Sequence, residues 1–229
     1  MSAGISMVIP DEIIRTKRKT IALIVGRDGR LIVRAPMRAG AESIQKFIAE
    51  KEKWIRTKQG HVKETYPPFV PKEYVNGEGF WYLGKIYKLQ LGENTKPLLY
   101  LNGNFQLART AVSKAPIAFE RWYREQAYTV ISERVQWYAA KHGFNYKQVK
   151  ITSARARWGS CNDKGTLSFA WRLVMAPVPV IDYVVVHELM HLRVKNHSKK
   201  FWALIQILMP DCKKRIEWLE INGHLLNLE

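Results

Sequence analysis

Short apolar runs separated by turn residues dominate the first hundred residues. KTIALIVGR precedes RLIVRAP, FWYL precedes IYKLQLG, and PLLYL precedes FQLA. The dipeptides that separate these pairs are Asp28-Gly29, Gly84-Lys85 and Asn102-Gly103. Glycine-containing dipeptides between apolar runs are typical of tight β-hairpins. The pattern predicts three hairpins, and we expect them to build a substantial antiparallel sheet.

One helical stripe interrupts these hairpins. Within Ala41 to Lys58, apolar residues recur at helical spacing, namely Ile44, Phe47, Ile48, Trp54 and Ile55. Such a stripe predicts an amphipathic helix. The segment TYPPFVP, from Thr65 to Pro71, follows it and is the best candidate for a linker because clustered prolines interrupt regular structure.

The pattern becomes mainly helical from about Pro116. The apolar positions of a long helix are Phe119, Trp122, Tyr123, Val130, Ile131 and Val135. The segment from Ser153 to Trp171 then has two strand-like runs around the turn residues NDKG, which predicts a hairpin. Three more helical segments follow. We therefore expect an α+β fold, with a β-rich N-terminal lobe of hairpins and one helix over residues 1–112 and a mainly helical lobe over residues 113–229.

Length and composition are those of a folded globular chain. The 229 residues are 47% hydrophobic, enough for one large core or two joined lobes. The N-terminal segment has no charged region leading into an apolar one, and no apolar run approaches the roughly 18 residues of a membrane span. Cys161 and Cys212 are the only cysteines. These features predict a cytoplasmic protein without a disulfide framework.

A strong positive charge widens the range of expected partners. Lysine and arginine number 37 against 20 acidic residues, a formal net charge of +17. Such a charge favours nucleic acid, nucleotides, acidic peptides or an anionic membrane surface. One basic cluster, formed by Arg193, Lys195, Lys199 and Lys200, adjoins three histidines and is expected to draw an anionic substrate toward them.

Those histidines belong to the segment VHELMHLRVKNH. It places His187, Glu188, His191 and His197 in the order HExxHx5H. Residues four apart lie on one face of a helix, so His187 and His191 can bind the same ion. Glu188 would flank that ion and is the expected general base toward a water molecule. The valines at 184–186 have low helix propensity and predict a buried helix, in which histidines and a glutamate need partners.

A catalytic zinc site needs a third protein ligand. His197 is the best candidate, and His224, Glu217 and Glu220 are its rivals. For His197 to turn back, the chain must leave the helix after His191. Asn196 tolerates the left-handed conformation that ends many helices, and Ser198 is suited to cap a following helix that begins SKKFW.

Two segments together resemble the YgjP-like metallopeptidase family, which is related to the WLM and SprT-like zincins. They are SARARWGSCNDKGTLSFAWRLVMAP, from Ser153 to Pro177, and HELMHLRVKNHSKKFW, and the resemblance is clearest from Glu120 to Leu219. It implies a zincin-like catalytic lobe and a zinc-dependent hydrolase. Its ligands would be His187, His191 and His197, and Glu188 would be its base.

The chain departs from related patterns at two positions. Ala170 precedes Trp171 where many relatives have asparagine, which puts in doubt a polar role at that position. Val194 stands where the metzincin pattern has a glycine, so membership of that branch is not expected.

The RWGSC hairpin is a candidate wall of a substrate cleft, because zincin clefts commonly follow the edge of a sheet and an extended peptide can add to such an edge. The candidate substrate-binding residues are Arg157, Trp158, Gly159, Ser160 and, one turn before His187, Tyr183. Arg157 and Tyr183 are also candidate oxyanion stabilisers. The alternatives are that Trp158 and Trp171 are core aromatics and that Gly159 forms a β-bulge. Cys161 is either a soft metal ligand or an ordinary buried thiol.

Three functions remain compatible with the sequence. The first is a zinc metallopeptidase for peptides or proteins that uses metal-activated water, with another divalent metal as an alternative to zinc. The second is a metal-dependent nucleotide phosphoanhydride hydrolase of the nucleoside triphosphate pyrophosphatase type, although the chain has no P-loop. The third is a SprT-like nucleic-acid-associated protease or binding module. The zincin pattern favours the first.

Overall fold

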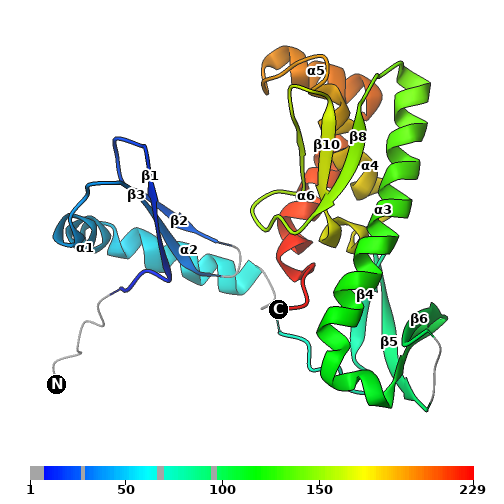
Figure 1. Cartoon of the computed structure of the whole chain (residues 1–229). Coiled ribbons are helices and arrows are strands. Elements are labelled where there is room, and N and C mark those ends of the chain that lie inside the picture. The colour runs from blue at the N-terminus through cyan, green and yellow to red at the C-terminus, as the bar shows by residue number, and fades with distance from the viewer. Residues whose placement is uncertain (1–7, 27–28, 66–69, 94–96) are drawn as a thin grey trace. The chain divides into compact units, whose positions relative to one another are not determined.

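The chain folds into two compact units, Met1–Val70 and Pro71–Glu229 (Figure 1). The computed structural model describes residues 8–26, 29–65, 70–93 and 97–229. The lobe boundary predicted after residue 112 does not coincide with this division, because it falls inside the second unit. Residues 66–69, most of the predicted linker, lie outside the described residues.

The first unit contains a small sheet and two helices. Its elements are β1 (Glu12–Thr16), β2 (Ala22–Val25), β3 (Leu31–Pro36), α1 (Ala41–Glu50) and α2 (Glu52–Thr65). The strand order is β1-β3-β2, in which β2 and β3 are antiparallel, as the hairpin pattern predicts, and β1 is parallel to β3. Its core is a separate apolar cluster of Leu31, Val33, Ala35, Ile44, Ile48 and Ile55.

The helix predicted over Ala41 to Lys58 is two helices. Lys51, with φ −105° and ψ 7°, ends α1, and α2 begins at the next residue. Ile48 and Ile55 nevertheless both lie in the same core. The apolar stripe continues across the break, so periodicity alone does not reveal it.

The second unit begins with a four-stranded sheet followed by a short 3-10 helix, η1. The elements are β4 (Gly79–Tyr82), β5 (Lys85–Gly92), β6 (Leu99–Asn102), β7 (Asn104–Ala108) and η1 (Arg109–Lys114). Two antiparallel hairpins, β4–β5 and β6–β7, are confirmed, and a parallel pairing of β5 with β7 joins them. The expectation of one antiparallel sheet from three hairpins was wrong, because β2–β3 belongs to the first unit and the other two hairpins meet through parallel strands.

The rest of the second unit is mainly helical. Its elements are α3 (Ala115–His142), β8 (Gln148–Thr152), β9 (Gly159–Cys161), β10 (Thr166–Ala170), η2 (Trp171–Met175), α4 (Val178–Met190), α5 (Lys199–Leu208), α6 (Cys212–Asn222) and η3 (Gly223–Leu225). The predicted hairpin is β9–β10, and β8 adds to β10 in parallel. The α+β class is confirmed. Among the described residues, no helix has both the length and the apolar character needed to cross a membrane.

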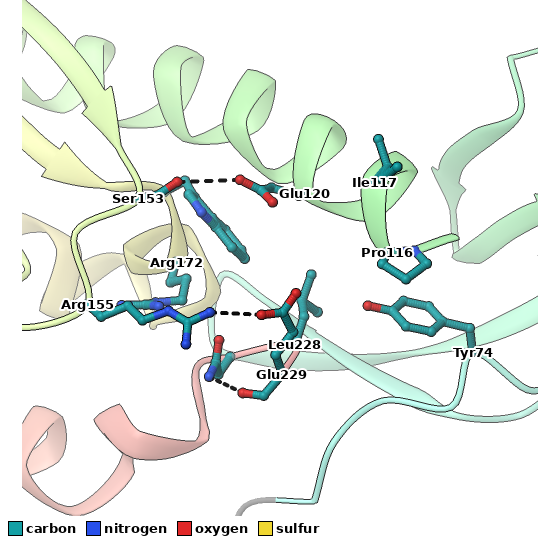
Figure 2. Close-up of a pocket in the computed structure, with 11 residues that line it drawn as sticks. Tyr74, Pro116, Ile117, Glu120, Ser153, Arg155, Arg172, Leu228 and Glu229 are labelled. Carbon is teal, nitrogen blue, oxygen red and sulfur yellow. Dashed lines mark hydrogen bonds and ion pairs between the residues drawn. The ribbon is translucent and has the colours of Figure 1, made fainter. Parts of the chain in front are cut away.

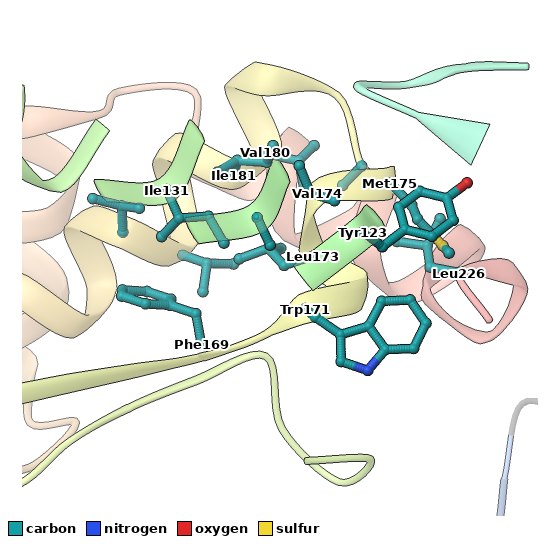
Figure 3. Packing of buried hydrophobic residues seen from close by; sticks show 14 of the residues in the cluster. Tyr123, Ile131, Phe169, Trp171, Leu173, Val174, Met175, Val180, Ile181 and Leu226 are labelled. Carbon is teal, nitrogen blue, oxygen red and sulfur yellow. The ribbon is translucent and has the colours of Figure 1, made fainter. Parts of the chain in front are cut away.

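Helix α3 connects both sheets of the second unit through one core. Near its start, Phe119 stacks on Phe80 of β4 with ring centroids 4.2 Å apart. Further along, Tyr123 stacks on Trp171 at 5.7 Å, and Figure 3 shows Tyr123 and Ile131 packed with residues of η2 and α4. A boundary after residue 112 would divide this core, which explains why the hairpins of residues 79–108 belong with the helices that follow.

The turn between β4 and β5 contacts the start of α4. Leu83 and Gly84 have positive φ angles of 48° and 78°, so the turn lies one residue before the predicted Gly84-Lys85. Their amides donate to the carbonyls of Val174 and Met175 at 2.9 and 3.0 Å. A Cβ atom on Gly84 would lie 2.8 Å from the Cα of Pro177. This close approach fixes the residue that precedes α4.

Candidate metal centre

Helix α4 is held firmly in the second unit. Val184, Val185 and Val186 are buried, so packing compensates for their low helix propensity. On another face, Asp182 accepts two hydrogen bonds from Arg134 of α3, at 2.5 and 2.8 Å. A two-point arginine–carboxylate pair restricts orientation as well as distance. The side chains that follow on α4 are therefore presented from a rigid support.

Three histidines converge at the end of this helix. Their candidate ligand atoms in His187, His191 and His197 all lie within 4.8 Å of one another. The rival residues His224, Glu217 and Glu220 are not members of this group, which is formed by described residues. The spacing of the motif thus predicted which histidines meet.

The chain reaches His197 by a different route from the one expected. Helix α4 ends at Met190, and His191 still has helical angles of φ −64° and ψ −15°. The left-handed helix end predicted at Asn196 was wrong, since Asn196 is not among the described residues with positive φ. The helix ends earlier, with the amides of Leu192 and Arg193 donating to Leu189 and Met190. Ser198 does occupy the N-cap position of α5, without a side-chain hydrogen bond.

Two aromatic residues of α5 surround the histidines, and the sequence interpretation did not include them. The Phe201 ring lies 5.0, 4.8 and 4.9 Å from those of His187, His191 and His197. Trp202 stacks on His197 at 5.9 Å. Their position in the segment SKKFW, directly after His197, could have indicated that they lie near the histidines. These rings restrict the orientations of the imidazoles.

Hydrogen-bond partners orient two of the imidazoles. Nδ1 of His191 lies 3.1 Å from the carbonyl oxygen of Val194, an acceptor, so Nδ1 carries the proton and Nε2 the lone pair. Nδ1 of His187 lies 3.4 Å from the Tyr183 hydroxyl. Outer contacts of this kind fix the tautomer of metal-binding histidines. Tyr183 is buried and does not line the cavity at the histidines, so it is placed to position His187 rather than to contact substrate.

His187 and His191 are held in the neutral form that a metal requires. Burial, together with the nearby His191 and His197, lowers the pKa of His187 to about 3. Burial also lowers the pKa of His191, and the backbone hydrogen bond to Val194 opposes that shift. At neutral pH both rings therefore have a lone pair to donate.

The three histidines fit a divalent ion of the zinc type. Two nitrogen ligands of a tetrahedral zinc ion lie about 3.3 Å apart at bond lengths of about 2.0–2.1 Å. Nε2 of His187 and Nε2 of His197 lie 2.9 Å apart. Three imidazoles beside an open cavity also leave room for a fourth position, as catalytic zinc sites do. Three imidazoles whose ligand atoms lie within 4.8 Å of one another could therefore hold a divalent metal ion.

Glu188 enters the same cavity from α4. Its side chain is 5% exposed, and burial raises its pKa to about 7, although the charge of Arg157 acts in the opposite direction. The backbone of Gly159 in β9 lies directly against it. A Cβ atom at position 159 would come within 2.6 Å of both Cγ and Oε1 of Glu188. The absence of a side chain at Gly159 is therefore what makes room for this carboxylate.

The cavity has a volume of about 350 Å³ and is bounded by α4, β9 and the segment that leads to α5. Its lining residues are Arg157, Gly159, Ser160, Cys161, Asp163, His187, Glu188, His191, Lys195 and His197. Of the predicted substrate-binding residues, the structure brings Arg157, Gly159 and Ser160 to the cavity. Trp158 instead packs against the core and lies close to Gly223, as the alternative interpretation proposed.

The basic cluster and the cysteine lie at different distances from the histidines. Of the four basic residues, Lys195 alone lines the cavity, where it pairs with Asp163 at 3.4 Å. Arg193 instead donates to the carbonyl of His142 at 2.6 Å, at the end of α3. Cys161 is a free thiol, burial raises its pKa, and it is not a member of the histidine group.

Strand β9 forms one edge of its sheet. In the order β8-β10-β9, it pairs with β10, and no other described strand adjoins it. An edge strand has unpaired main-chain groups that can bind an extended chain. Because Gly159, Ser160 and Cys161 also line the cavity, these groups lie beside the histidines.

Comparison with known proteins gives one match over most of the chain. Residues 19–222 match the family of YgjP-like metallopeptidase domains. Among solved structures, the metallopeptidase zymogen abylysin of Pyrococcus abyssi is similar to 42% of this chain and over 94% of its own length, with 19% identity and a TM-score of 0.37. No curated protein is significantly similar to the chain.

Proposed function

The chain belongs to the YgjP-like metallopeptidase family, and from this premise we propose that it is a zinc-dependent peptidase with Glu188 as its general base. The family makes it a metal-dependent hydrolase. The proposal adds the residues and the metal: His187, His191 and His197 as the three ligands, and zinc as the ion. The observation that carries it is the convergence of three histidines beside a buried carboxylate in one cavity.

The side chains of this cavity suit peptide hydrolysis. When bound, zinc supplies Lewis-acid polarisation of the scissile carbonyl and of the attacking water. Glu188 accepts the proton of that water on its carboxylate as the oxygen attacks the carbonyl carbon, and then delivers it to the leaving amine nitrogen as the C–N bond breaks. The pKa near 7 that burial gives this carboxylate suits both transfers. Tyr183 and Val194 keep His187 and His191 in place.

Strand β9 provides the expected means of binding the substrate. An extended peptide that adds to its free edge would place a backbone carbonyl next to Glu188, because Gly159 contacts that side chain. Arg157, at the cavity wall, contributes positive charge near Glu188. Main-chain pairing would allow the site to bind peptides of many sequences, whereas Arg157 and Lys195 would favour substrates with acidic side chains.

A substrate panel tests the proposed reaction. Peptides and nucleoside triphosphates are incubated with protein of measured metal content, before and after chelation and after zinc is restored. We expect cleavage of peptides in proportion to bound zinc, loss of cleavage on chelation, and recovery on zinc addition. Triphosphate hydrolysis without peptide cleavage would instead support the nucleotide hydrolase, for which the positively charged Arg157 and Lys195 of the cavity are the motivating feature.

Replacing His197 with alanine tests the third ligand. The change should weaken zinc binding at least about 100-fold, because outer-shell contacts alone typically contribute 10–100-fold to metal affinity. Zinc affinity is measured by competition with a chromophoric chelator. The matched control is His224→Ala, which removes a histidine outside the group. Retained affinity in the His197 variant, or equal losses in both, would contradict the assignment.

A further inference from the structure

A second cavity in the same unit has no assigned role. It has a volume of about 130 Å³ and lies between the start of α3, the segment after β8, η2 and the last residues of the chain (Figure 2). It shares no lining residue with the cavity at the histidines, among the residues that the structure describes.

One wall contains a buried arginine that has no ion pair among the described residues. Arg172 is 7% exposed, and among the described residues its one hydrogen bond is from Nη2 to the carbonyl of Ala154, at 2.9 Å, with no ion pair. Burial lowers its pKa, the charge of Arg155 lowers it further, and the charge of Glu120 acts in the opposite direction. A buried guanidinium without a carboxylate is costly.

The carboxylates nearby already have partners. Glu120 pairs with Arg124 at 2.8 Å, and Glu229 pairs with Arg155, also at 2.8 Å. Neither side-chain carboxylate forms an ion pair with Arg172 within the described structure, so a ligand carboxylate that reached Arg172 would give its guanidinium the partner it lacks.

The opposite wall contains a tyrosine hydroxyl without a partner. The side chain of Tyr74 is buried, and its hydroxyl has no hydrogen bond within the described structure. Figure 2 shows this hydroxyl directed toward Leu228, into the cavity. Burial and nearby carboxylates raise the pKa of Tyr74 to about 12, so the hydroxyl remains a donor. Buried polar groups in folded proteins normally have a partner, and an exception requires an explanation.

The backbone of Tyr74 adopts an unfavourable conformation. Its φ of 58° lies in the left-handed region, which is unfavourable for a residue with a side chain. The Glu78 carboxylate accepts hydrogen bonds from the backbone amides of Glu73 and Tyr74, at 3.2 and 2.5 Å. The Tyr74 ring also packs against the ring of Phe119, with centroids 5.4 Å apart. Such strain is characteristic of residues with a binding role.

We propose that this cavity binds an acylated amino acid with a free carboxylate, the chemistry of the carboxyl-terminal residue of a peptide. The carboxylate would pair with Arg172, and the acyl carbonyl would accept a hydrogen bond from the Tyr74 hydroxyl. The apolar surfaces of Ile117, Trp171 and Leu228 suit a small aliphatic side chain. A ligand without a carboxylate would leave Arg172 without an ion pair, and a ligand without a carbonyl would leave Tyr74 unpartnered.

Three small probes test the two contacts with the full-length protein. N-acetyl-alanine has both groups, N-acetyl-alaninamide lacks the carboxylate, and butyrate lacks the acyl carbonyl. By saturation-transfer NMR and titration calorimetry, we expect N-acetyl-alanine to bind best and the amide at least about tenfold more weakly, as the loss of a charge-assisted hydrogen bond implies. Equal binding of N-acetyl-alanine and its amide, or no binding of either, would overturn the proposal.

Substitutions in the two walls of the cavity distinguish a loss of ligand binding from a loss of stability. Tyr74→Phe removes a hydroxyl without a partner, so its thermal midpoint should equal that of the wild type while N-acetyl-alanine affinity falls about fivefold. The control Tyr123→Phe removes a hydroxyl that donates to the Trp81 carbonyl at 2.6 Å, and should lower the midpoint without changing affinity. Arg172→Met should abolish binding. Unchanged affinity in Tyr74→Phe would contradict the assignment, even if the Arg172 variant does not fold.

A comparison of longer probes identifies the source of the ligand. A peptide ending in alanine and its amidated form are compared with N-acetyl-alanine on the wild-type protein. Tighter binding of the free-carboxylate peptide would assign the cavity to peptide ends, and tighter binding of N-acetyl-alanine would assign it to a small acyl amino acid.

Discussion

Peptide turnover is expected to fall by about 1,000-fold when Glu188 is replaced by glutamine, within the range of about 10²–10⁴ that general acid–base groups contribute. Glutamine has nearly the same size and fills the space against Gly159, but its amide cannot accept the proton of the attacking water. The three histidines are unchanged, so bound zinc should remain stoichiometric. The measurement is kcat for a cleaved peptide, together with metal content by atomic emission.

Glu217→Gln is the matched control for this substitution. It makes the same chemical change on α6, outside the histidine group, and should preserve both turnover and zinc. Full activity in the Glu188 variant would refute the general-base role. Loss of zinc from that variant would indicate instead that Glu188 is part of the metal site itself.

Gly159→Ala should reduce kcat by about 100-fold, although it adds only a methyl group. That methyl would lie 2.6 Å from Oε1 of Glu188, so the carboxylate must move by several tenths of an ångström or more. A misplacement of about 1 Å at a reacting group typically costs about 100-fold in rate. Zinc affinity should change little, because the three atoms nearest the new methyl all belong to Glu188. Turnover and metal content are again measured together.

A double variant shows whether Gly159 acts through Glu188. If both substitutions act on the same carboxylate, adding Gly159→Ala to Glu188→Gln should lower the rate little beyond the effect of Glu188→Gln alone. If instead the fold-decrease in rate of the double variant equals the product of the two single fold-decreases, β9 has a separate role, such as binding the peptide. Gly60→Ala in α2 is the control for a glycine with open space around it, and should leave turnover unchanged.

Local patterns predicted the elements well, and long-range pairings poorly. The three hairpins and the long helix α3 were found because their signals lie within one or two turns of chain. The parallel pairings β1–β3 and β5–β7 join strands separated by other elements, so no local pattern indicates them. The division into units depends on such pairings and on the stacking of Phe80 with Phe119 across the predicted boundary.

The candidate site shows the same contrast. The spacing of His187, His191 and His197 predicted their convergence, because a helix and one short return bring them together. The contact of Gly159 with Glu188 depends instead on how β9 packs against α4, and no spacing reveals it. Tyr183, one turn before His187, is buried and reaches the Nδ1 of His187 without lining the cavity, and its expected substrate-binding role stays a prediction. Nucleic-acid binding and a cytoplasmic location stay predictions.

The turn at Leu83 and Gly84 determines how short an active fragment can be. A chain cut to begin at residue 113 would retain every residue of the histidine cavity. It would nevertheless lack the amides that bind the carbonyls of Val174 and Met175, the glycine that packs on Pro177, and the strands that cover Phe119. The shortest fragment worth expressing therefore begins near Pro71, about a hundred residues before the helix that it must support.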